Sequence, residues 1–148
     1  MRKFLPLAAV LSVMVSANAA TPPATLELRL VVPCQSGDKA LPLIGANEEL
    51  CLAKEKLADG SDVVKVERYP SLPKAVVEIT PAAADRLQAA TSTGGDDQRL
   101  GFVFNGKLIF APYVGGPLKL KQLPVSLKND PDDVDALVAA FPGAVAAQ

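Results

Sequence analysis

Alternating apolar and polar residues predict that most of this chain folds as β-strands. In residues 25–33, Leu26, Leu28 and Leu30 share one face, and Pro33 ends the alternation. Further strands are expected at residues 49–55, 61–69, 74–80 and 118–127, and in a hairpin at 100–112. Pro124 lies inside the last of these strands, which favours a place for it at a sheet edge.

Two segments instead repeat apolar residues at helical spacing. In the segment 80–91, Thr80 is a natural N-cap and Pro81 fits the first helical position. The segment 130–141 begins in the same way with Asp130 as the cap, followed by Pro131. Its apolar stripe is formed by Val134, Leu137, Val138 and Phe141. The expected fold class is therefore α+β, an antiparallel or mixed β-sheet with two helices packed on one face.

The predicted hairpin is apolar on both faces. Asn105-Gly106 is a strong signal for a two-residue turn. Pairing the strands across it gives one face with Leu100, Phe102, Phe104, Ile109 and Ala111, and a second with Gly101, Val103, Leu108 and Phe110. Two helices cover one face only, so Val103, Leu108 and Phe110, with Tyr113 nearby, are the predicted protein-contact surface. The alternative is that the loop 34–48 and the remaining strands bury the second face as ordinary core.

The first residues have the layout of a secretory signal peptide. Arg2 and Lys3 precede an apolar run, and Ala17-Asn18-Ala19 offers a cleavage site. We expect a signal peptide at 1–20, a loose leader at 21–24, one domain at 25–143 and a frayed tail at 144–148. Cleavage near Ala19 or Ala20 implies a periplasmic or secreted chain. It leaves 13 basic against 16 acidic residues, which argues against nucleic acid as a partner.

Two cysteines, Cys34 and Cys51, follow the first predicted strand and open the second. If these strands are antiparallel neighbours, an oxidising compartment favours a disulfide between them. Two free thiols, or a reactive pair, remain the alternatives. The spacing is not C-x-x-C, and the chain has no His to complete a metal or redox site.

The residue types present in the sequence give little indication of a catalytic site. Without His the usual general base is missing, and no serine has an evident activating partner. Asp96-Asp97 fits a solvated turn, and the acidic residues from 130 to 135 fit a helix start better than a calcium loop. The chain is expected to be no enzyme and to bind no cofactor or metal.

The order of elements resembles the head region of the first periplasmic domain of SecD, a subunit of the bacterial protein-export machinery. The stretches that carry the likeness are LELRLVV at 26–32, VVEITPAAADRLQAAT at 76–91 and RLGFVFNGKLIFAP at 99–112. SecD crosses the membrane several times, whereas this sequence has no further apolar span after its predicted signal peptide. The resemblance therefore implies the fold, and with it the holding of translocated polypeptide, but no proton-driven transport.

Two functions follow as hypotheses. The first is a non-catalytic periplasmic domain that binds polypeptide or an envelope protein through the hairpin surface. The second is a protein–protein module, such as an enzyme inhibitor or a subunit of an envelope complex, in which the loop 34–48 is clamped by Cys34 and Cys51 and makes the contact. The partner and the oligomeric state are not specified by the sequence.

Overall fold

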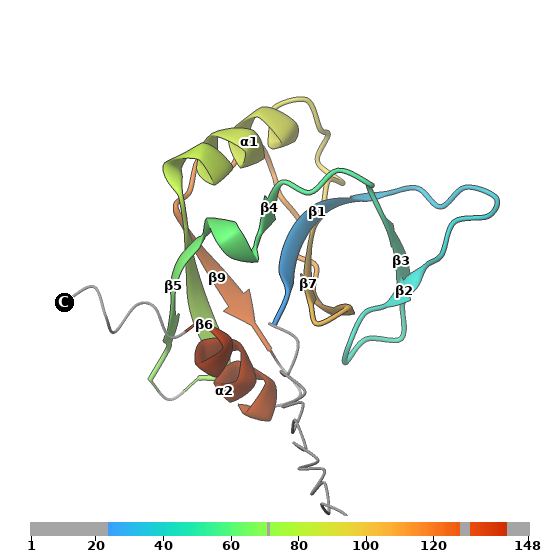
Figure 1. Ribbon diagram of the computed structural model, residues 1–148. Helices are drawn as coiled ribbons and strands as arrows, with labels where there is room; N and C mark the ends of the chain where they lie inside the picture. The colour runs from blue at the N-terminus through green and yellow to red at the C-terminus, as the bar shows by residue number, and fades with distance from the viewer. Residues whose placement is uncertain (1–23, 71, 128–130, 142–148) are drawn as a thin grey trace, which may run out of the picture.

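The strands form two antiparallel sheets, and two helices complete the α+β fold (Figure 1). The structure is a computed structural model that describes residues 24–70, 72–127 and 131–141. The larger sheet contains β1 (Leu26–Val32), β2 (Leu41–Pro42), β3 (Glu49–Leu52), β4 (Ala58–Asp59), β7 (Leu100–Phe104) and β8 (Lys107–Phe110). The smaller sheet contains β5 (Val63–Arg68), β6 (Lys74–Ile79) and β9 (Gln122–Ser126). The helices are α1 (Pro81–Thr91) and α2 (Pro131–Ala140). The α+β class is confirmed, but the sequence did not indicate the division into two sheets.

Strand β1 is the centre of the larger sheet. It pairs with β7 along one side and with β3 and β4 along the other. Its alternation is the one expected, because Leu26 and Leu28 are each 1% exposed and pair with Phe104 and Phe102. The side chains of one sheet face thus enter the core together.

The helix signals act as expected. The Thr80 side chain accepts a hydrogen bond from the N–H of Ala83, and Pro81 occupies the first position of α1. Helix α2 begins at Pro131 and packs against β5 and β6. The predicted cap Asp130 lies outside the described residues, as do the predicted signal peptide 1–20, residues 21–23 of the predicted leader and the tail 144–148. No helix in the described part of the chain is long and apolar enough to cross a membrane.

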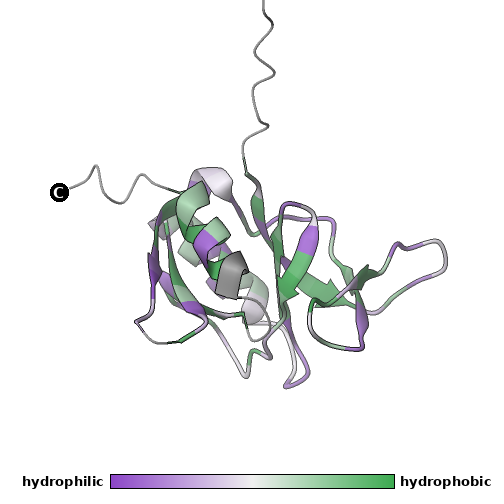
Figure 2. Cartoon of the chain, turned by 90° about the horizontal axis from the view of Figure 1, so that it is seen from below, coloured by the Kyte–Doolittle hydropathy of each residue, from purple (hydrophilic) through white to green (hydrophobic). Residues whose placement is uncertain are grey.

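One apolar cluster joins both sheets and both helices. Figure 2 shows green, apolar residues along much of the strands, whereas many loop positions are purple or pale. The cluster includes Leu28 and Phe102 from the larger sheet, Val77 from the smaller one, Leu87 from α1 and Leu137 from α2. Each of these side chains is at most 1% exposed, so burial of apolar surface from all four elements stabilises the fold.

The hairpin contains a β-bulge that the sequence did not reveal. Phe102 pairs with Phe110, whereas the adjacent residue Val103 pairs with Leu108, so Ile109 is the extra residue on its strand. The ring centroids of Phe102 and Phe110 are 5.6 Å apart. The prediction that Phe110 shares a face with Val103 and Leu108 is therefore wrong, because the bulge moves it to the side of Phe102.

The second hairpin face is covered by the segment that contains β2 and β3. An isolated bridge joins Leu43 to Leu108, and the N–H of Ile44 donates to the Leu108 carbonyl at 2.9 Å. The Leu52 side chain lies so close that a Cβ on Gly101 would be 2.8 Å from its Cδ2 atom. We call residues 41–52 the covering arm. The alternative interpretation of the sequence, in which the 34–48 loop and other strands bury this face, is the one that the structure supports.

Candidate functional site

An apolar groove lies between the end of β8 and strand β9. It has two hollows of about 430 and 340 Å³, and Phe110 and Pro112 line both of them. The larger hollow continues over Tyr113, Leu118 and Leu120, and among the residues that the structure describes no charged side chain lines either hollow. Tyr113 is 68% exposed and Leu120 is 44% exposed. We refer to this feature as the β8–β9 groove.

A buried threonine positions one wall of the groove. Thr91, at the end of α1, is fully buried and donates its hydroxyl proton to the Leu87 carbonyl at 2.8 Å. The same Oγ1 atom accepts the backbone N–H of Leu118 at 2.8 Å. A helix end is thereby joined to the glycine- and proline-rich segment 112–118, which forms the wall although it contains no regular strand.

Arg99 supports the opposite end of the same wall. Its Nε donates to the Ala111 carbonyl at 3.0 Å, and its guanidinium lies 4.7 Å from the centre of the Tyr113 ring. Its Nη1 also contacts the Glu48 carboxylate at 2.7 Å. Arg99 thus links the covering arm to Tyr113, and it holds an exposed aromatic ring at the mouth of the groove.

The four residues of the predicted contact surface do not lie together at the surface. Val103 is 7% exposed and Leu108 is completely buried, so the prediction that these two face solvent is wrong. The covering arm supplies the partners that the hairpin seemed to lack. Phe110 and Tyr113 line the groove, and a contact role for them stays a prediction.

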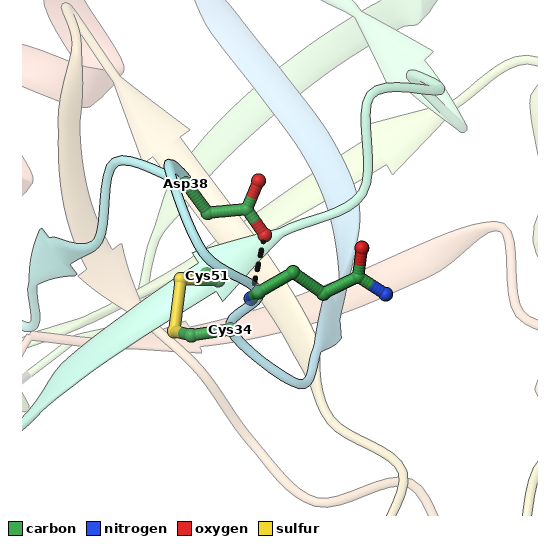
Figure 3. The surroundings of a disulfide bond; sticks show 4 residues. Cys34, Asp38 and Cys51 are labelled. Atoms are coloured by element: carbon green, nitrogen blue, oxygen red, sulfur yellow. Dashed lines mark hydrogen bonds between the residues drawn. A yellow bond between two sulfur atoms is a disulfide. The ribbon is translucent and has the colours of Figure 1, made fainter.

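The cysteine prediction is confirmed by a disulfide between Cys34 and Cys51 (Figure 3). Cys51 is in β3, whereas Cys34 comes two residues after the end of β1. The N–H of Gln35 donates to the Asp38 carboxylate at 2.9 Å, which closes a small turn next to the bridge. The exposed segment between β1 and β2 projects away from both helices in Figure 1.

Two carboxylates with shifted pKa values, Glu27 and Asp59, make hydrogen bonds that stabilise the fold. Burial alone would raise the pKa of Glu27, but hydrogen bonds from Lys56 and Arg29 outweigh it and the pKa is lowered. Hydrogen bonds from the Ser61 hydroxyl and N–H lower the pKa of Asp59, which caps the short 3-10 helix Gly60–Asp62. Within the described ranges, no group of three or more acidic or cysteine side chains could hold a metal ion.

Sequence reasoning missed much of the groove. The alternation in the sequence predicts a strand over 118–127, whereas β9 begins at Gln122, so Leu118 and Leu120 precede it. The available signal was Pro112-Tyr113-Val114-Gly115-Gly116-Pro117, in which apolar residues stand among glycine and proline without strand alternation. Such a segment is typical of a shaped loop, but only the fold shows that it faces β9.

Comparison with known proteins identifies the fold. The sequence matches no protein-family model and no curated protein. A solved structure of SecDF, described as a membrane component that enhances protein export, is similar with a TM-score of 0.59 at 17% identity, covering 80% of this chain and 61% of that one. A structure of SecDF in a super-membrane-facing form is similar with a TM-score of 0.58 at 16% identity, covering 80% of this chain and 18% of that one.

The chain therefore spans less than two thirds of either SecDF chain, and identities this low concern the fold alone. The matched region covers 80% of this chain. Neither sheet alone contains that many residues, so the similarity extends over more than one sheet. The resemblance that the sequence indicated is confirmed at the level of the fold, which is SecD-like over 80% of this chain.

Proposed function

We propose that this chain is a non-catalytic periplasmic binding domain that holds an extended or unfolded polypeptide in the β8–β9 groove. The observation that carries the proposal is the exposure of Tyr113 and Leu120 beside an apolar groove without charged lining. Contiguous apolar surface that stays open in a folded domain usually marks an interaction site. Arg99 and Thr91 hold the two ends of the wall formed by residues 112–118, so this wall is formed before a ligand arrives.

The compartment is part of the proposal. The Cys34–Cys51 disulfide fits a chain that folds in an oxidising environment. The fold shared with SecDF, itself described as enhancing protein export, supports polypeptide as the ligand. A domain in the periplasm with this groove would meet chains before they fold, when their apolar side chains are still exposed.

The test uses a fluorescently labelled, permanently unfolded secretory polypeptide and the purified protein. Replacing both exposed groove residues, Tyr113→Ser with Leu120→Ser, should weaken binding about tenfold or more, since the two side chains supply much of the open apolar area. The matched control is Tyr69→Ser with Leu72→Ser, because these residues are similarly exposed at 46% and 48% but lie outside the groove. Equal affinity of the two double variants, each shown to be folded by its thermal transition, would refute the proposal.

A further inference from the structure

One edge of strand β9 has no strand partner within the described residues, and we call it the free edge. The order of the smaller sheet is β5-β6-β9, and among residues 24–70, 72–127 and 131–141 no strand pairs with the other side of β9. A free edge presents backbone N–H and C=O groups that can pair with an added strand. Gln122 and Pro124 are exposed and Ser126 is half-buried, so this edge is accessible.

The hydrogen-bond register shows which backbone groups point outward. The N–H of Leu127 donates to the Pro73 carbonyl and the N–H of Ile79 donates to the Lys121 carbonyl, both at 2.8 Å. Since alternate residues of an antiparallel strand bond to the same neighbour, Leu123 and Val125 also bond to β6. The backbone groups of Gln122, Pro124 and Ser126 therefore face the free edge.

Proline 124 occupies the central outward position. It has no N–H, so it costs no hydrogen bond within the sheet, and it removes one donor from the free edge. The edge retains the N–H and C=O groups of Gln122 and Ser126 and the Pro124 carbonyl. The loss of one donor weakens pairing along the whole edge, but the remaining groups still allow a short strand to be added.

The free edge borders the β8–β9 groove. Leu123 and Pro124 line the larger hollow, and Ser126 lines the smaller one. On the opposite wall, the carbonyl of Leu108 in β8 is already bonded to Ile44. The β8 edge is thus partly engaged, whereas β9 has no strand partner on its outer side within the described residues.

Charge near the groove favours a particular kind of ligand. Lys119 and Lys121 are exposed and alternate with Leu118 and Leu120 at the larger hollow. Among the residues that the structure describes, the lining itself carries no charged side chain, and the Arg99 guanidinium at Tyr113 adds a third cation near the groove. These cations complement a polypeptide that carries acidic residues next to an apolar segment.

We propose that the ligand binds by adding a strand to the free edge of β9, with an apolar face against the groove and an acidic end beside Lys119 and Lys121. The inference rests on the proposed function and specifies its mode of binding. It predicts that affinity depends on alternate backbone N–H groups of the ligand, because only every second residue of an added strand faces β9.

The experiment uses a labelled ten-residue peptide of alternating valine and threonine that ends in two aspartates, and a series methylated at one backbone nitrogen each. Methylation of nitrogens that face β9 should weaken binding about tenfold, and methylation of the intervening ones less than about twofold. The protein variant Pro124→Ala restores an outward N–H and should strengthen binding about two- to tenfold. Replacing the two aspartates of the peptide by lysines should weaken its binding to the wild-type protein at low salt.

The outcomes separate this inference from the proposed function. Peptide binding that depends on Tyr113 and Leu120 but shows no alternation with methylation would overturn strand addition and leave the groove as the site. Loss of binding for both the peptide and the unfolded polypeptide would refute the proposed function as well. Binding of the unfolded polypeptide but not the peptide would overturn strand addition alone. A dimer in sedimentation experiments that excludes the peptide would assign the edge to a second copy and overturn the inference.

Discussion

At the scale of single residues, Thr91 shows how one polar side chain connects core and groove. Its hydroxyl is inside the apolar cluster, yet both its donor and acceptor capacities are used, by the Leu87 carbonyl and the Leu118 N–H. A buried polar group is tolerated when it is hydrogen-bonded in this way. Thr91 therefore gives the irregular segment 112–118 a fixed point that apolar packing alone would not supply.

Replacing this threonine should affect stability and binding together. Thr91→Val keeps the shape but leaves the Leu118 N–H without its acceptor, so the free energy of unfolding should fall by about 1–3 kcal/mol. Binding of unfolded polypeptide should weaken as the wall loosens. Urea denaturation and fluorescence titration measure the two effects. Thr91→Ser is the control because it keeps the hydroxyl, and a valine variant with the stability and affinity of the serine variant would show that the bond has no such role.

At the scale of elements, the sequence predicts those features that depend only on residues close together in the chain. The cap of α1 and the alternation of β1 follow from side-chain chemistry within a few residues, and the structure confirms both. The bulge at Ile109 could not be found in this way, because its register is set by how β7 and β8 pack on the rest of the fold. One shifted residue was enough to move Phe110 to the other face of the hairpin.

The sequence offered burial by the 34–48 loop and the remaining strands only as an alternative, for a related reason. Strand β2 consists of Leu41 and Pro42, too short to give an alternation pattern. Its place over the hairpin depends on Leu43 meeting Leu108, 65 residues later in the numbering, and such long-range pairing leaves no local signal. The candidate surface moved from Val103 and Leu108 to the groove as a consequence.

Removing the disulfide tests which element makes contact with a ligand. The bridge joins residues 17 apart, so Cys34→Ala with Cys51→Ala should lower the free energy of unfolding by about 3 kcal/mol. Groove binding should change by less than about twofold at temperatures where the variant is folded, since neither cysteine lines the groove. Urea denaturation and peptide titration provide the measurements. A folded variant that no longer binds its partner would instead favour the loop 34–48 as the contact, the alternative function that the sequence suggested.

At the scale of the whole molecule, the larger sheet almost returns on itself. Its strand order is β2-β3-β1-β7-β8, and the Leu43–Leu108 bridge brings the chain just after β2 back to β8. This arrangement buries the second face of the hairpin and engages part of the β8 edge. The smaller sheet has no such closure at β9 within the described residues, so the open edge and the apolar groove occur at the same place.

The central strand also determines how the molecule should respond to acid. Glu27 in β1 contacts Arg29 at 2.8 Å and Lys56 at 3.0 Å, and Arg29 also donates to the carbonyls of Ala53 and Lys54. The folded-state pKa of Glu27 lies below its ordinary value of 4.5. The unfolded chain therefore binds the proton more readily, and the stabilisation from this group is complete above about pH 4.5 and is lost as the pH falls through the folded pKa.

Glu27→Gln should lower the free energy of unfolding by about 1 kcal/mol at neutral pH, and the difference from the wild type should shrink as the pH falls below about 4.5. Urea denaturation at a series of pH values from about 3 to 7 measures this difference. Glu55→Gln is the control, because Glu55 is exposed and close in sequence to Lys56. The carboxylate holds the segment 53–56 against β1 through charged hydrogen bonds. Protonation of Glu27 at low pH removes its negative charge, and the glutamine variant lacks this charge at every pH. A wild-type advantage that stays constant over the whole pH range would mean that the charge of Glu27 contributes nothing, and that its shape alone supports the sheet.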